Sequence, residues 1–121
     1  MLFRSTVIGC GGDRDRGKRP LMAEIAFTQS DLVVFTSDNP RNESPDQIID
    51  EMMKGIPAGK IREVMRNTSR AAAIQTACAL SQPGDIILVA GKGHETYQEI
   101  AGERFPFSDV EELQNNLSIN T

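Results

Sequence analysis

The chain has 121 residues, enough for a single domain over residues 1–121 with a modest hydrophobic core. Its net charge is −4 and no basic stripe runs along it, which argues against a nucleic-acid partner. No signal peptide is evident and no apolar run approaches membrane-spanning length, so we expect a cytoplasmic domain with no membrane partner.

The first strand expected along the chain is Thr6–Ile8, which opens into a glycine-rich loop at residues 9–19. Pro20 suits the first turn of the following helix, because a proline there loses no helical hydrogen bond. Apolar residues at helical spacing continue this helix: Leu21, Met22, Ile25 and Ala26. Residues 32–35, Leu-Val-Val-Phe, are apolar without alternation, as in a strand covered on both faces.

The second helix has clear start and stop signals. Ser44 can cap it, Pro45 takes the first helical position, and Gln47 can complete a capping box. Gly55 ends it. Its apolar face contains Ile48, Ile49, Met52 and Met53.

A short strand over residues 61–65 and a third helix are expected next. The helix begins at Thr68 or Ser69 and runs through Leu80. Its buried side holds Ile74, Ala77 and Cys78.

The C-terminal part is expected to contain a strand, a hairpin and a helix. Residues 86–90 are the clearest buried strand in the sequence, and residues 97–107 indicate a hairpin. A last short helix runs through Leu113, and residues 114–121 are expected to form a frayed tail.

Strands and helices therefore alternate along the chain. This pattern predicts an α/β fold with a mostly parallel sheet flanked by helices, followed by a C-terminal hairpin. In open sheets of this class, ligands bind at the carboxyl ends of the strands. The loops at those ends are residues 9–19, 37–44 and 91–96, which hold most of the glycines and unusual polar residues. We therefore expect the three loops to form one shared site.

The first loop contains two incomplete nucleotide-binding motifs. Gly9 and Gly11 begin a dinucleotide fingerprint, but its third glycine would fall at Arg14. Residues 12–18 resemble a P-loop, but Arg19 stands where a Ser or Thr would ligate magnesium. What remains is a helix start that suits an anion, beside Arg14, which can clamp a carboxylate. The alternative is that the arginines of this loop only form surface ion pairs with its aspartates.

The second and third loops carry complementary charges. In Asp38-Asn39-Pro40-Arg41 the proline stiffens the turn, and the arginine can bind a carboxylate through two parallel hydrogen bonds. The bland alternative is ordinary turn chemistry with a solvated Arg41. In the third loop Gly91 lets the backbone approach a ligand, and Glu95 supplies a negative charge that suits an amine. Arginines for a carboxylate and a glutamate for an amine together predict an amino-acid site.

Other chemistry finds little support in the residues. His94 is the only histidine and no second ligand has convincing spacing, so no metal site is predicted. Cys10 and Cys78 are expected to be reduced thiols. No serine or cysteine has a recognisable base, so no catalytic residue is assigned. The incomplete P-loop leaves open a stand-alone module that binds an anion or a nucleotide.

Three segments together resemble the carboxy-terminal domain of the Mur ligases. They are Gly-Cys-Gly-Gly-Asp-Arg-Asp-Arg-Gly-Lys-Arg-Pro at 9–20, Asp-Asn-Pro-Arg at 38–41 and Gly-Lys-Gly-His-Glu at 91–95. The similarity runs from about residue 5 to residue 113 and is strongest to members that add meso-diaminopimelate. It implies a Rossmann-like domain that supplies the amino-acid site of an ATP-dependent amide ligase of peptidoglycan synthesis. In that family ATP phosphorylates a carboxylate of the UDP-MurNAc-dipeptide, and the incoming amine attacks the acyl phosphate.

The resemblance also implies roles for individual residues. Arg14, Asn39 and Arg41 would hold the far carboxylate of meso-diaminopimelate. Asp38, Gly91 and Glu95 would contact its amino-acid head. Family members that add lysine usually lack the arginine of this turn, because lysine has no second carboxylate.

The resemblance finally implies that the chain corresponds to part of such an enzyme. The sites for ATP, Mg²⁺ and the UDP-sugar belong to other domains, and the first strand–helix unit of the family's carboxy-terminal domain is not represented. We therefore expect an exposed sheet edge, no cofactor bound by this chain, and no activity from it alone. An inactive folded fragment is the remaining alternative.

Overall fold

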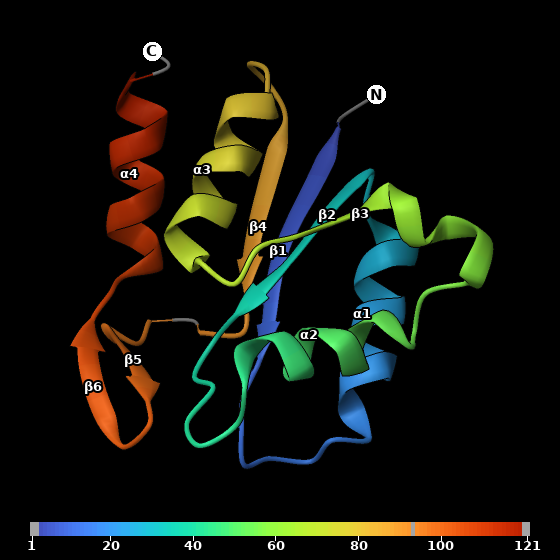
Figure 1. Ribbon diagram of the computed structural model, residues 1–121. Coiled ribbons are helices and arrows are strands. Elements are labelled where there is room, and N and C mark those ends of the chain that lie inside the picture. Colours follow the sequence, from blue (N-terminus) through green and yellow to red (C-terminus); the bar gives the residue numbers. More distant parts are fainter. Residues whose placement is uncertain (1–2, 93, 120–121) are drawn as a thin grey trace.

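The computed structural model describes residues 3–92 and 94–119, in which strands and helices alternate as expected (Figure 1). In chain order the elements are β1 (Arg4–Cys10), α1 (Lys18–Gln29), β2 (Leu32–Ser37), α2 (Pro45–Met53), the 3₁₀ helix η1 (Ala58–Glu63), β3 (Val64–Arg66), α3 (Arg70–Leu80), β4 (Ile86–Ala90), β5 (Tyr97–Ile100), β6 (Glu103–Pro106) and α4 (Asp109–Ile119). Strands β1 to β4 form a parallel sheet in the order β3-β2-β1-β4, and β5 pairs antiparallel with β6. The predicted α/β fold with a C-terminal hairpin is confirmed.

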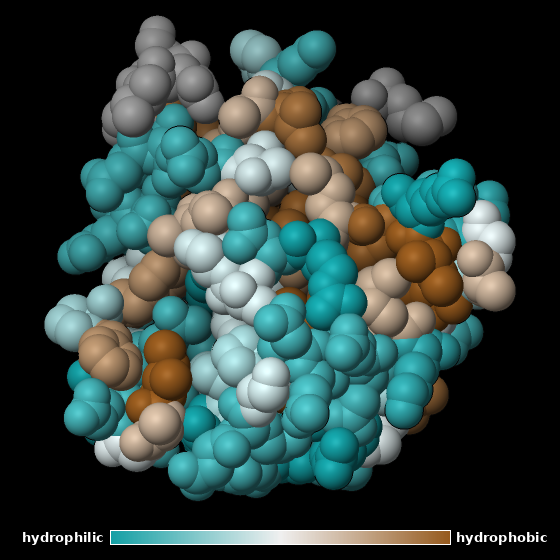
Figure 2. All heavy atoms as spheres, in the orientation of Figure 1, coloured by the Kyte–Doolittle hydropathy of each residue, from teal (hydrophilic) through white to brown (hydrophobic). Residues whose placement is uncertain are grey.

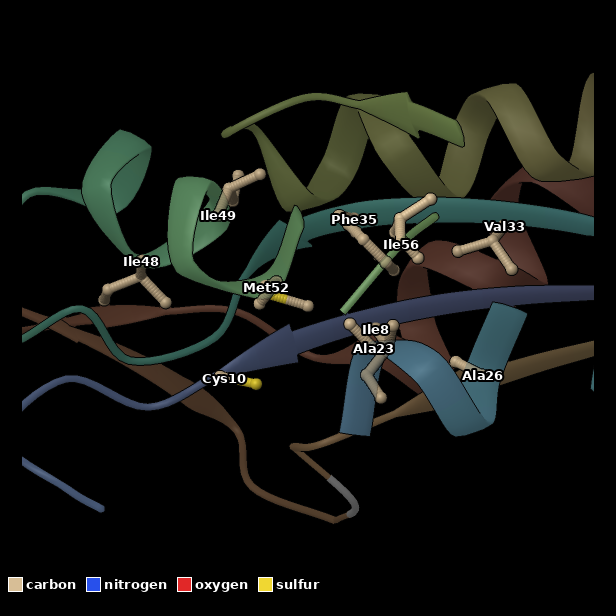
Figure 3. Packing of buried hydrophobic residues seen from close by; sticks show 10 residues of the cluster. All are labelled: Ile8, Cys10, Ala23, Ala26, Val33, Phe35, Ile48, Ile49, Met52 and Ile56. Atoms are coloured by element: carbon tan, nitrogen blue, oxygen red, sulfur yellow. The ribbon is translucent and has the colours of Figure 1, made fainter. Parts of the chain in front are cut away.

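Helices cover both faces of the sheet because its central strands bury side chains on both sides. On β1 the consecutive residues Val7 and Ile8 point to opposite faces. Ile8 packs in a cluster with residues of α1 and α2 (Figure 3). Val7 packs with residues of α3, and Leu113 of α4 adjoins that second cluster. The first cluster contains Ile8, Cys10, Ala23, Ala26, Val33, Phe35, Ile48, Ile49, Met52 and Ile56.

The starts of α2 and α3 follow the capping signals of the sequence. The Ser44 hydroxyl accepts a hydrogen bond from the backbone N–H of Gln47, and Pro45 begins α2. Ser69 caps α3 in the same way, accepting from the backbone N–H of Ala72. Both predicted helix starts are therefore confirmed, because a hydroxyl three residues ahead satisfies an otherwise unpaired N–H group.

The prediction that residues 86–90 form a buried strand is wrong as to burial. The strand exists as β4, but it lies at one edge of the sheet, and Ile86 and Leu88 are 47% and 56% exposed. An apolar run shows that a strand is suited to burial, whereas its neighbours in the sheet decide whether burial occurs. The expected exposed edge is present at this strand.

Helix α1 buries different residues from the large apolar ones at helical spacing. Leu21 and Ile25 are exposed, while Ala23 and Ala26 face the core. Small side chains at these two positions let the helix backbone lie close to the sheet.

Two further expectations need correction at element boundaries. The expected strand at residues 61–65 is mostly the end of η1, and β3 is limited to Val64–Arg66. The last helix, expected to run only through Leu113, continues as α4 to Ile119. Residues 120 and 121 lie outside the described part of the chain.

A buried arginine joins the first loop to the second loop and to α2. Arg19 is 1% exposed, and its guanidinium donates to both carboxylate oxygens of Glu43, at 3.1 and 2.7 Å. It also donates to Glu51 at 2.7 Å and to the carbonyl of Gly11 at 2.9 Å. The backbone N–H of Asp13 donates to Glu43 as well. Arg19 therefore fixes residues 11–13 of the first loop against Glu43 of the second.

Replacing Arg19 with methionine is expected to destabilise the fold. The substitution removes the buried partner of two partly exposed carboxylates, and breaking a buried ion pair from one side typically costs about 3 kcal/mol. Chemical denaturation of both proteins measures the change in the free energy of unfolding. Arg16→Met is the matched control, because Arg16 also pairs with Glu51 but is 65% exposed. An equal loss in the two variants would contradict the structural role of Arg19.

The stability of the fold is also expected to fall in acid through Glu43. Hydrogen bonds from Arg19, and then from the backbone of Asp13, lower the pKa of Glu43 from 4.5 to about 2. Because the folded-state pKa is the lower one, the stabilisation is fully present above pH 4.5 and is lost as the pH falls towards 2. Urea denaturation of the original chain and of Glu43→Gln between pH 6 and pH 3 measures this, and the difference in stability should shrink with falling pH. A difference independent of pH would refute the assignment.

Candidate functional site

The three loops that follow β1, β2 and β4 meet at the carboxyl-terminal end of the sheet, as the sequence predicts (Figure 1). The backbone N–H of Gly12 in the first loop donates to the carbonyl of Asn39 in the second at 2.7 Å. Lys92 in the third loop forms an ion pair with Asp38 in the second at 2.9 Å. This end of the molecule is mostly hydrophilic on the face that Figure 2 shows. A cleft of about 300 Å³ opens between the loops, and Arg14, Asp38 and Gly91 are among its lining residues.

A second buried arginine sets the positions of the strand ends from which two of these loops depart. Arg70, at the start of α3, donates to the carbonyl of Ser37 at 3.0 Å and to that of Ala90 at 3.3 Å. It also forms two hydrogen bonds of 2.7 Å with Asp109 at the start of α4. Asp38 and Gly91 are the next residues along the chain. Arg70 therefore fixes the backbone from which Asp38 and Gly91 continue, although it does not line the cleft.

Arg41 has an unusual backbone conformation that the hairpin holds in place. Its φ is 53°, in the left-handed region that non-glycine residues rarely adopt. Its backbone N–H donates to the carbonyl of Glu99 at 3.0 Å, and its own carbonyl accepts from the N–H of Ala101 at 2.7 Å. The sequence did not indicate that the hairpin takes part in the site. Two backbone hydrogen bonds from the hairpin therefore hold Arg41 in this conformation.

The Arg41 guanidinium lies over the first loop with donors to spare. Its Nη1 donates to the carbonyl of Gly12 at 2.9 Å, and its Nε lies 3.9 Å from the Glu99 carboxylate. Among the described residues only Nη1 donates hydrogen bonds, so other N–H groups stay available for a carboxylate. A Cβ at Gly11 would lie 3.0 Å from Nη1, so the glycine leaves room for this side chain.

Arg14 is exposed in the cleft and is not part of an ion-pair lattice with the loop's aspartates. Its guanidinium donates to the carbonyl of Asp13 at 3.2 Å, and no carboxylate pairs with it in the described part of the chain. Arg16 pairs with Glu51 rather than with an aspartate. The alternative of local pairs with the aspartates therefore does not hold for either arginine.

Asn39 is buried and its amide is engaged within the protein. It is 2% exposed, and its Oδ1 accepts from the Lys92 ammonium at 3.0 Å and from the backbone N–H of Glu99 at 2.9 Å. Its Nδ2 donates to Glu95 at 3.3 Å, and the Glu95 side chain is 36% exposed. Asn39 thus positions the Glu95 carboxylate through a hydrogen bond, whereas Glu95 itself is partly exposed to solvent.

The six residues singled out from the sequence therefore fall into two neighbouring groups. Arg14, Asp38 and Gly91 line the cleft. Asn39, Arg41 and Glu95 are not among its lining residues. Arg41 is joined to the first loop by its hydrogen bond to the Gly12 carbonyl, and Glu95 is joined to the second loop by its hydrogen bond from Asn39. Gly93 of the third loop lies outside the described residues.

Lys92 is the residue of this site that sequence analysis missed. Its side chain is fully buried, although a lysine between two glycines is typical of an exposed loop. Three oxygens surround its ammonium, those of Asp38, Asn39 and the Tyr97 carbonyl. The only local signal was its position two residues after the end of β4 at Ala90, which does not reveal burial.

Among the described residues the geometry supports neither a reactive cysteine in the cleft nor a metal site. Burial raises the pKa of the Cys10 thiol to about 11, so the cysteine in the cleft stays protonated at neutral pH. In the described part of the chain, no group of histidine, cysteine and acidic side chains could hold a metal ion. Within the same residues, none of the helices has the length and apolar character needed to cross a membrane.

Comparisons with known proteins agree with the loops and the fold. Residues 4–93 match the family described as "Mur ligase, glutamate ligase domain". The chain is 60% identical over 112 residues to the UDP-N-acetylmuramoyl-L-alanyl-D-glutamate–2,6-diaminopimelate ligase of Chlorobium phaeobacteroides, covering 93% of this chain and 21% of the relative. It is 56% identical over 115 residues to the ligase of the same name from Cytophaga hutchinsonii, covering 93% of this chain and 24% of the relative.

A solved structure extends this similarity to three dimensions. A structure of UDP-N-acetylmuramoyl-L-alanyl-D-glutamate–2,6-diaminopimelate ligase superposes with a TM-score of 0.90 and 45% sequence identity, covering 99% of this chain and 24% of that one. The chain thus spans about a fifth to a quarter of the length of these relatives. Family match, sequence and fold agree, and the chain belongs to the Mur ligase family, of which it represents the carboxy-terminal domain.

Proposed function

We propose that this chain is the amino-acid-binding domain of an ATP-dependent amide ligase that adds meso-diaminopimelate to UDP-MurNAc-L-Ala-D-Glu in peptidoglycan biosynthesis. The observation that carries the proposal is the Arg41 guanidinium, fixed by the hairpin and by Gly12 with donors still available. Relatives that share more than half of its residues are named as diaminopimelate ligases. A cytoplasmic location goes with the proposal, because ATP is a cytoplasmic substrate.

The charges around the cleft suit a zwitterion with an extra carboxylate. Arg41 and Arg14 flank Gly11, and together they offer donors to the far carboxylate of the amino acid. Asp38 and Glu95 offer carboxylate oxygens to its ammonium groups. The glycine at position 91, with φ of 111°, lets the ligand lie close to the backbone. In this proposal the domain binds the amino acid and orients its amine for attack on the acyl phosphate.

The residues of this chain do not fit ATP with Mg²⁺, although the family is ATP-dependent and generally requires Mg²⁺. Arg19 occupies the position of the magnesium-binding hydroxyl of a P-loop, and its side chain is buried against Glu43 and Glu51. The phosphorylation step therefore falls to the parts of the enzyme outside this chain. We assign no catalytic residue here, and we expect the chain alone to be inactive.

Replacing Arg41 with alanine is expected to weaken meso-diaminopimelate binding by about tenfold or more, because a charge-assisted hydrogen bond contributes about 1.5–3 kcal/mol. Lysine lacks the second carboxylate, so its weaker binding should hardly change. Titration calorimetry with both ligands measures the effect. Arg62→Ala, an exposed arginine of η1, is the control and should bind both ligands as the original chain does. Equal affinity of the original chain for lysine and meso-diaminopimelate would overturn the assignment.

Ligand-dependent stability separates this proposal from a nucleotide-binding module. Binding to the folded state alone raises the melting temperature by mass action. We expect meso-diaminopimelate to raise it and ATP with Mg²⁺ at the same concentration to leave it unchanged. Differential scanning fluorimetry makes the comparison. Stabilisation by ATP without any effect of the amino acid would favour the stand-alone nucleotide-binding module instead.

A further inference from the structure

Lys92 is a buried cation at the centre of the three loops, and oxygens of the protein surround its ammonium. Its Nζ lies 2.9 Å from Asp38 Oδ1, 3.0 Å from Asn39 Oδ1 and 2.8 Å from the Tyr97 carbonyl oxygen. Lys92 donates hydrogen bonds to Asn39 and to the Tyr97 carbonyl, whereas its contact with Asp38 is an ion pair without a hydrogen bond. The nearest oxygen of Glu95 lies farther away, at 3.8 Å. The Lys92 side chain is fully buried and does not line the cleft, so it is not placed to meet the carboxylate of a ligand.

Two of the oxygens around Lys92 belong to Asp38 and Asn39, side chains whose orientation matters for the site. Lys92 is the only ion-pair partner of the Asp38 carboxylate among the described residues, and it engages one of the two oxygens. The Asp38 side chain is 12% exposed and lines the cleft, so the second oxygen stays available to a ligand. The ammonium therefore fixes the carboxylate at one oxygen and leaves the other for an amine.

The Asn39 amide is oriented by the same ammonium. Its Oδ1 accepts from Lys92 and from the backbone N–H of Glu99, and both groups are only donors. A flipped amide would place its own N–H groups against these donors, so the flip is excluded. The orientation directs Nδ2 to Glu95, to which it donates at 3.3 Å. Lys92 thus acts on Glu95 through Asn39.

We propose that Lys92 is the positioning residue of the amino-acid site, holding Asp38 and, through Asn39, Glu95 so that both carboxylates face the ammonium groups of the ligand. This inference rests on the proposed function and assigns Lys92 no contact with the ligand. It differs from the role of Arg41, which acts on the far carboxylate. A substitution at Lys92 should therefore weaken the binding of any amino acid that presents its ammonium here, whether or not it has a second carboxylate.

The test uses Lys92→Met, which keeps the length of the side chain without its charge, and Lys92→Arg, which keeps the charge. Calorimetry at a temperature where circular dichroism shows each variant folded gives the affinity for meso-diaminopimelate and for lysine. Lys92→Met should lose about tenfold or more for both ligands, because the ion pair that holds Asp38 and the charge-assisted hydrogen bond that orients Asn39 are both lost. Lys92→Arg should also stay weak, since a planar guanidinium cannot reproduce the three contacts of an ammonium. Lys54→Met, an exposed lysine at the end of α2, is the control and should bind normally.

A structural role alone predicts a different result. Lys92→Met would then lower the melting temperature, but its folded form would bind both ligands as tightly as the original chain, and this outcome would overturn the proposal. Wild-type affinity of Lys92→Arg would overturn it as well, because charge alone would then suffice. If Lys92→Met does not fold, Lys92→Arg decides by the same affinity measurement.

Nuclear magnetic resonance without ligand separates failure of this inference from failure of the proposed function. The side-chain amide signals of Asn39 should shift in Lys92→Met and in Lys92→Arg, but not in Lys54→Met. If the original chain binds no amino acid, the proposed function falls, and these signals alone judge Lys92. Unchanged Asn39 signals in the Lys92 variants would then overturn its positioning role.

Discussion

The ion pair between Arg70 and Asp109 is the interaction on which the rest of the site depends. Both side chains are almost fully buried, and the guanidinium also holds the carbonyls that end β2 and β4. Two strand ends and the starts of two helices are thereby brought to one point. A charge buried this deeply is costly unless every neighbour compensates it, so the arrangement tolerates little displacement. The backbone positions of Asp38 and Gly91 are fixed as well, because these are the next residues along the chain.

Buried and exposed cations have different tasks around the loops. Arg19, Arg70 and Lys92 are nearly fully buried, and each is surrounded by carboxylate or carbonyl oxygens of the protein. They fix backbone and side-chain positions and have little left to offer a ligand. Arg14 and Arg41 are more exposed and keep free donors. In the proposed function these two arginines bind the carboxylate of the ligand, and the buried cations fix the loops from which both project.

Sequence analysis located the features that depend on neighbours along the chain. Ser44 with Pro45 marked a helix start, and the three polar loops marked one edge of the sheet, because capping and strand direction are local or follow from alternation. The burial of Lys92 depends on oxygens from Asp38 and from Tyr97 in the hairpin, and no local pattern encodes that meeting. The exposure of Leu88 has the same kind of origin, since the place of β4 in the sheet is decided by pairing with β1 alone.

The first loop shows how one substitution changes the chemistry that a common framework supports. With a hydroxyl at position 19 the segment would resemble a phosphate-binding loop, whose backbone wraps around an anion. Arg19 instead turns inward and binds the Gly11 carbonyl, Glu43 and Glu51. The Arg19 guanidinium thus joins the first loop to the second and is not available to bind a polyphosphate. In the proposed function Arg14 and Arg41 bind the anion instead, and their separate positions on the two loops suit one carboxylate of a small ligand better than a chain of phosphates.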